Sequence, residues 1–95
     1  MAYNIIQSYA PGFKQVFKKM RATQQKAVED AILAIASYKR TGAAGFGLHI
    51  KHLGPKIYEA RIDISNRIVF FSDKNSIRFL AVGNHNDVLR ALKQI

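Results

Sequence analysis

The second half of the chain carries residues that together have the chemistry to cleave RNA without a metal ion. They are His52, Glu59, Arg61, Arg67 and His85. In such cleavage the 2′-hydroxyl attacks the adjacent phosphorus. A base must take its proton, cations must hold the developing negative charge, and an acid must protonate the leaving oxygen. Arg61 and Arg67 have the guanidinium groups that grip phosphate, and a nearby His or Glu would move the protons.

Each of these residues also has a simpler explanation. His85 follows Gly83 where a strand pattern meets a helix pattern, and a neutral imidazole can act as a base. From position alone, His85 is more simply explained as part of a capping turn. Glu59, Arg61 and Arg67 fit a solvated strand face whose cross-strand charge pairs contribute roughly 0.2–1 kcal/mol each.

The remaining polar candidates are one histidine and several basic residues. His52 lies beside a predicted turn, from which it could reach the charged face, although a lone histidine is more often a surface residue. His49 and His52 would point to opposite faces of an extended segment, so we expect no metal site. Three further basic residues are expected to contact RNA: Lys51, Lys56 and Arg78.

Two helices are predicted in the first half of the chain. A short strand over 4–9 ends before Pro11, which suits a helix start, and apolar residues then recur at helical spacing from Phe13 to Met20. Thr23 is the expected N-cap of a second, longer helix that reaches Tyr38. We expect these helices to form a hairpin, followed by a glycine-rich linking loop over 39–47.

From Leu48 onward the apolar pattern has a period of two, which predicts four strands. They cover 48–53, 57–64, 67–71 and 77–82, with tight turns between them. A final helix is predicted to begin at Asn84. The order is therefore β-α-α-β-β-β-β-α, an α+β fold in which an antiparallel-rich sheet packs on the N-terminal helical hairpin. The helices are expected on one face of the sheet, with charged residues on the other.

The composition is that of one small domain spanning residues 1–95. The 95 residues are 48% hydrophobic, which is too apolar for intrinsic disorder, and 15 Lys and Arg against 6 Asp and Glu give a net charge of +9. The absence of cysteine excludes disulfides and cysteine-ligated metals. No segment has the length of a membrane span or the form of a signal peptide, so a cytoplasmic protein is expected. The charge should attract nucleic acid, an anionic membrane surface or an acidic protein. The alternative is that exposed lysines only keep the protein soluble.

Four short segments in the second half of the chain are informative through their order and spacing. They are His52-Leu53-Gly54, Ile57-Tyr58-Glu59-Ala60-Arg61-Ile62, Asn66-Arg67-Ile68-Val69-Phe70-Phe71 and Val82-Gly83-Asn84-His85-Asn86-Asp87-Val88-Leu89. Their order and spacing resemble the RelE/ParE superfamily of toxins of type II toxin–antitoxin systems. Members carry a leucine–glycine turn, a Tyr-x-x-Arg strand, an Arg-Ile/Leu-Val-Phe/Tyr strand and a late glycine shortly before the last helix.

This resemblance implies a microbial-ribonuclease-like sheet and cleavage of messenger RNA, commonly in the ribosomal A site. The Gly-x-His ending is most similar to the YafQ branch, in which a histidine at the position of His85 takes part in catalysis and another near His52 contributes. Arg61 and Arg67 match basic positions that bind the scissile phosphate. The sequence departs from many members of the superfamily at three positions. Glu59 stands where some carry a lysine, Ala81 where many carry a basic residue, and Leu89 where many carry an aromatic residue.

The resemblance also implies partners. A small acidic or amphipathic antitoxin would wrap the basic body in a hetero-oligomer, and messenger RNA and the ribosome would be the targets. No cofactor, metal or membrane is implied. Two alternatives stay open: the ParE branch shares the fold and poisons DNA gyrase without being a nuclease, and a basic binding domain could be inert.

Overall fold

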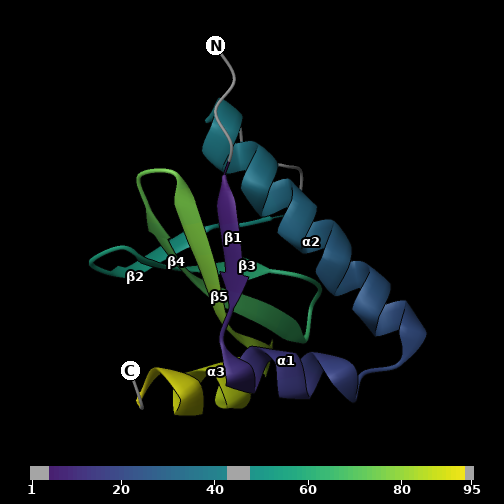
Figure 1. Ribbon diagram of the computed structural model, residues 1–95. Helices are drawn as coiled ribbons and strands as arrows, with labels where there is room; N and C mark the ends of the chain where they lie inside the picture. The colour runs from purple at the N-terminus through teal and green to yellow at the C-terminus, as the bar shows by residue number, and fades with distance from the viewer. Residues whose placement is uncertain (1–4, 43–47, 94–95) are drawn as a thin grey trace.

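The computed structural model describes residues 5–42 and 48–93, and these form the elements in the predicted order (Figure 1). The strands and helices are β1 (Ile6–Tyr9), α1 (Pro11–Lys18), α2 (Ala22–Thr41), β2 (Lys51–Gly54), β3 (Ile57–Arg61), β4 (Asn66–Asp73), β5 (Ser76–Asn84) and α3 (His85–Leu92). The α+β class is therefore confirmed.

One five-stranded sheet, in the order β1-β5-β4-β3-β2, holds the described part of the chain together. Strands β2 to β5 form an antiparallel meander, while β1 runs parallel to β5 and closes the other edge. The central place of β4 follows from its sequence, because Ile68, Val69 and Phe70 are all buried and face alternate sides. The two-residue turn at Lys74 and Asn75 fixes the β4–β5 register.

The sheet is covered on both faces, which corrects the expectation that all helices lie on one side. Helices α1 and α2 pack on one face, where Phe13 and Ile35 belong to the same core cluster as Ile68 and Phe79. Helix α3 packs on the opposite face, where Val88 forms a second cluster with Val69 and Ala81. Val69 alternates with Ile68 along β4, so the two clusters lie on different sides of the sheet. Figure 1 shows α1 and α3 at the same end of the sheet.

Both ends of α2 differ from the prediction. The N-cap is Arg21 in an extended conformation, not Thr23, because the connection between the two helices takes only 19–21. The Gln25 side chain donates to the Phe17 carbonyl (2.9 Å) and ties the two helices together there. At the other end α2 continues to Thr41 and stops at Gly42, whose φ of 77° is the left-handed conformation that glycine adopts readily. The rest of the expected glycine-rich loop, 43–47, lies outside the described residues.

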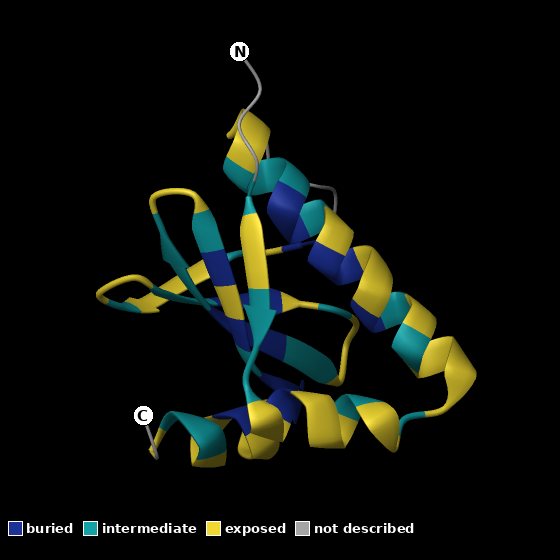
Figure 2. Ribbon diagram, in the orientation of Figure 1, coloured by how far each residue is buried: buried dark blue, intermediate teal, exposed yellow. Residues whose placement is uncertain are grey.

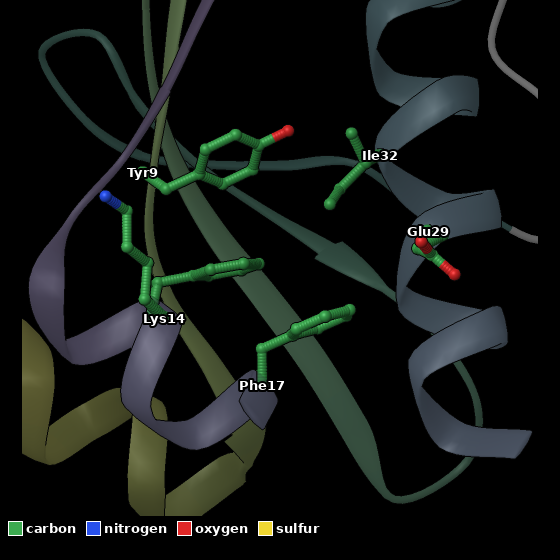
Figure 3. A pocket seen from close by; sticks show the side chains of 6 residues that line it. Tyr9, Lys14, Phe17, Glu29 and Ile32 are labelled. Atoms are coloured by element: carbon green, nitrogen blue, oxygen red, sulfur yellow. The ribbon is translucent and has the colours of Figure 1, made fainter. Parts of the chain in front are cut away.

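The expected helical hairpin is an open one. Helices α1 and α2 diverge from their connection, as Figure 1 shows. A cavity of about 280 Å³ lies between them. Its walls include the rings of Tyr9, Phe13 and Phe17 and the side chain of Ile32 (Figure 3).

Of the four strands predicted from Leu48 onward, two are shorter than expected and two are longer. Residues 48–50 are not in a strand, since His49 has a φ of 44° that a strand does not allow. Strand β3 stops at Arg61, because Asp63 draws the next residues into a turn by accepting hydrogen bonds from the N–H groups of Ser65 and Asn66 (2.8 Å each). Strands β4 and β5 extend beyond their predicted ends.

Candidate functional site

Two arginines face each other on neighbouring strands and form the centre of the candidate site. Arg61 at the end of β3 pairs with Arg67 on β4, and Arg67 pairs with Gly83 on β5. Directly opposed cross-strand residues point to the same face of a sheet. Like charges in this position destabilise the free protein, and no ion pair or hydrogen bond within the described chain holds the exposed Arg61 side chain. An anion bound between the two guanidinium groups would relieve this repulsion.

A mostly buried carboxylate lies beside this pair. Glu59 precedes Arg61 by two residues on β3 and therefore shares its face. Its Oε1 lies 3.9 Å from Nη1 of Arg67, with the two side chains 10% and 24% exposed. Lys51 on β2 is opposite Glu59 and adds a further positive charge to the same face. The register thus produces the expected grouping of Glu59, Arg61 and Arg67 on one face, and it adds Lys51 to them.

His85 comes to the same end of the sheet through the junction of β5 and α3. Its chain position is two residues after Gly83, the partner of Arg67, so its Cα lies within about 7 Å of the Gly83 Cα. The His85 side chain is exposed and makes no hydrogen bond to another described residue.

A capping box fixes the start of α3 and with it the backbone of His85. Oδ1 of Asn84 accepts from the Asp87 N–H (2.9 Å), and Oδ2 of Asp87 accepts from the Asn84 N–H (3.1 Å). Gly83 allows this arrangement, because its φ is 149° and a Cβ there would lie 2.7 Å from Oδ2 of Asp87. His85 is therefore both near a capping turn and free to react, so the two explanations of its position are compatible.

The sequence analysis did not predict the capping box of Asn84 and Asp87 or the close approach of Asp87 to Gly83. The three-residue spacing from Asn84 to Asp87 is typical of a capping box and could have predicted the first of these. The close approach of Asp87 to Gly83 had no comparable signal, because it depends on the angle at which α3 leaves the sheet.

The structure does not bring His52 to this group. His52 pairs with Tyr58 across β2 and β3, and the two rings stack with centroids 4.7 Å apart. Tyr58 in turn stacks on Phe70 in the main core, on the face covered by α1 and α2. Glu59, the next residue along β3, points to the opposite face. The sheet itself therefore separates His52 from the arginine pair.

Two of the expected RNA contacts lie away from the arginines. Arg78 pairs with Phe71, four residues along β4 from Arg67, which corresponds to about 13 Å. Lys56 is in the β2–β3 turn, at the opposite end of β3 from Arg61, and forms an ion pair with Asp73 (3.1 Å). Arg78 lies on the same face of the sheet as Arg67 and has no charged partner in the described chain, whereas Lys56 is paired with Asp73.

The candidate site lies on the face of the sheet on which α3 packs. Among the candidate residues, Arg61 contributes to the wall of a cavity beside Ala31 and Ala34 of α2. Within residues 5–42 and 48–93, no group of three His, Asp or Glu side chains is arranged to hold a metal ion. Ala81, where many members of the superfamily have a basic residue, is buried beneath Val88 of α3.

Comparison with solved structures identifies the fold. The YoeB toxin of Staphylococcus aureus, solved as a dimer, is similar with a TM-score of 0.68 and 21% identity, over 87% of this chain and 99% of that chain. The YafQ toxin from the E. coli DinJ–YafQ complex gives a TM-score of 0.70 at 11% identity, over 87% and 96%. The chain has the same fold as these two toxins.

A further match shows how widely this fold is distributed. The RelB–RelE antitoxin–toxin complex of Methanococcus jannaschii is similar with a TM-score of 0.64 and 18% identity, over 87% of this chain and 95% of that chain. No protein-family model and no curated protein sequence matches the chain. None of the described helices is long and apolar enough to cross a membrane.

Proposed function

We propose that this protein is the toxin of a type II toxin–antitoxin system and that it cleaves messenger RNA. The observation that carries the proposal is the opposed pair of Arg61 and Arg67 next to the exposed His85. Two adjacent guanidinium groups favour a phosphate, and a histidine at their edge supplies the proton transfer that attack by a 2′-hydroxyl requires. The RelE-type fold supports the same reaction.

Each residue has a distinct part in this proposal. Arg61 and Arg67 hold the scissile phosphate and stabilise the charge that develops on its oxygens. His85 is the main proton-transfer residue. Glu59, 3.9 Å from Arg67, orients that guanidinium and assists the proton transfer. His52 is left out of the group, because the sheet lies between its ring and the arginines.

Arg67 and His85 line none of the cavities found in the described part of the protein, which favours RNA that is held by a larger body. Charged groups that are not set in a cleft bind a phosphate but leave the flanking nucleotides free, so they orient a single strand poorly. Messenger RNA in the ribosome is already held in place. We therefore propose ribosome-bound messenger RNA as the substrate, and an acidic antitoxin that covers the basic face as the partner that silences it.

Primer extension on a reporter messenger RNA tests the proposal after induction in growing bacteria without antitoxin. We expect new 5′ ends within codons for the wild type and none for His85→Ala, while circular dichroism and antitoxin binding stay unchanged. His85 is exposed, so its loss should not disturb folding. Growth arrest with intact messenger RNA would refute cleavage and favour gyrase poisoning instead, and normal growth would favour an inert binding domain.

A second variant in the same assay tests the placement of the other histidine. His52→Ala should continue to produce the same 5′ ends, because its ring stacks on Tyr58 on the face of the sheet away from the arginines. Loss of cleavage in this variant, with folding intact, would return His52 to the catalytic group.

A further inference from the structure

The connection between β3 and β4 carries a bulky apolar side chain that no other described residue covers. Ile64 is 92% exposed, against 66% for Leu33, the next most exposed large hydrophobic residue in the described chain. Turns ordinarily take Gly, Asn, Asp or Ser, whose backbone and side-chain preferences suit them. A β-branched apolar residue at this position buries almost none of its surface in the free protein, so its side chain is open to contact by another molecule.

The turn that presents Ile64 is firmly held. Oδ1 of Asp63 accepts from the N–H groups of Ser65 and Asn66, and the Asn66 side-chain amide donates to both oxygens of Asp63 (3.1 Å each). On the other side of Asp63, Ile62 packs against the main core. A side chain mounted on a rigid turn loses little conformational entropy when it binds, which makes Ile64 an efficient contact residue.

The position of this turn links it to the arginine pair. It begins directly after Arg61 and ends at Ser65, two residues before Arg67, and Ile64 is three residues from each arginine. The length of the chain places its Cα within about 11 Å of either arginine Cα. Figure 2 shows the turn as an exposed segment at the side of the sheet, below α2.

We propose that Ile64 packs against a nucleobase adjacent to the phosphate held by Arg61 and Arg67, and so helps to select where the RNA is bound and cut. This inference rests on the proposed function. A nucleotide presents a charged phosphate and an apolar base face side by side, and the β3–β4 turn offers matching groups within the same short segment. The two arginines make a polyanion a better occupant of this end of the sheet than an uncharged protein surface.

Mapping of 5′ ends after induction tests this role with two matched variants. Ile64→Ser should lower cleavage roughly three- to tenfold and flatten the nucleotide preference beside the cut, because an apolar contact with one base is lost. Ile64→Leu should retain most of both. Leu33→Ser is the control, since it makes the same kind of change at an exposed site on α2 and should cleave like the wild type. Thermal unfolding of Ile64→Ser should match that of the wild type.

The possible failures of this experiment are distinguishable. If Ile64→Ser cuts the same sites at the same rate as the wild type, the proposed base contact is refuted while the proposed function stands. If Ile64→Ser loses antitoxin binding and keeps normal cleavage, Ile64 is a protein contact and the inference is wrong. If the wild type itself produces no new 5′ ends, the proposed function fails and takes this inference with it.

Discussion

Arg61 and Arg67 are placed opposite each other at a cost to the free protein. Like charges on directly opposed strand positions destabilise a sheet, and the weak 3.9 Å contact between Arg67 and Glu59 leaves Arg61 without compensation. A protein selected for stability alone would gain by replacing one of them. An anion bound between the two side chains would offset this cost, so on the proposed function stability and cleavage should respond in opposite directions to the same substitution.

Arg61→Gln is the variant that separates these two effects. We expect its free energy of unfolding to stay the same or rise by up to about 1 kcal/mol, because the cross-strand repulsion disappears. Cleavage should fall roughly tenfold or more, because one phosphate ligand is lost. Urea unfolding and primer extension measure the two quantities. Arg40→Gln removes an exposed charge at the end of α2 and should leave cleavage unchanged. A parallel loss of stability and cleavage in Arg61→Gln would contradict the interpretation.

Strands and helices could be predicted from the sequence to the extent that local pattern and turn chemistry determine them. The alternation of apolar residues fixed β3, β4 and β5, and it put Glu59, Arg61 and Arg67 on one face. The side of the sheet on which α3 packs was not predictable, because the apolar stripe through Val88 fits either face. The side of the sheet to which His52 points was also not predictable, because it depends on the β2–β3 register. A shift of that register by one residue would move every side chain of the strand to the other face.

The β3–β4 turn makes stability depend on acid pH. Partial burial raises the pKa of Asp63, but hydrogen bonds from the Asn66 side chain and from the N–H groups of Ser65 and Asn66 outweigh it, so the pKa lies below its ordinary value of 3.8. A lowered pKa means that the folded protein favours the carboxylate. Its contribution is therefore complete above about pH 3.8 and is lost as the pH falls through the lower, folded-state value.

Asp63→Asn should remove this dependence. The variant should be less stable than the wild type at pH 7, by about 1 kcal/mol or less because the turn is exposed, and the difference should shrink as the pH falls below about 3.8. Thermal unfolding of both proteins between pH 7 and pH 3 measures this difference. A gap that is constant over the whole range would show that the charge on Asp63 contributes nothing to the turn.

The whole molecule carries a net charge of +9, but the proposed site uses only part of it. Basic side chains also lie on α1 and at its C-cap, and three lysines there have no counterpart in the proposed chemistry: Lys14, Lys18 and Lys19. Two ways of binding RNA are therefore distinguishable. Either the whole basic body attracts the strand without preference, or one face of the sheet makes a small number of defined phosphate contacts.

The salt dependence of binding decides between these two ways. A site formed by Lys51, Arg61, Arg67 and Arg78 neutralises three or four phosphates, so log K should fall against log[salt] with a slope of roughly −2 to −3 for a single strand. Fluorescence anisotropy with an oligonucleotide lacking the attacking 2′-hydroxyl measures it between about 50 and 200 mM salt. Arg67→Gln should make the slope shallower by about 0.7, whereas Lys18→Gln on α1 should leave it unchanged. A much steeper slope that responds equally to both substitutions would mean that the strand binds the entire basic surface, and that the arginine pair is not a specific site.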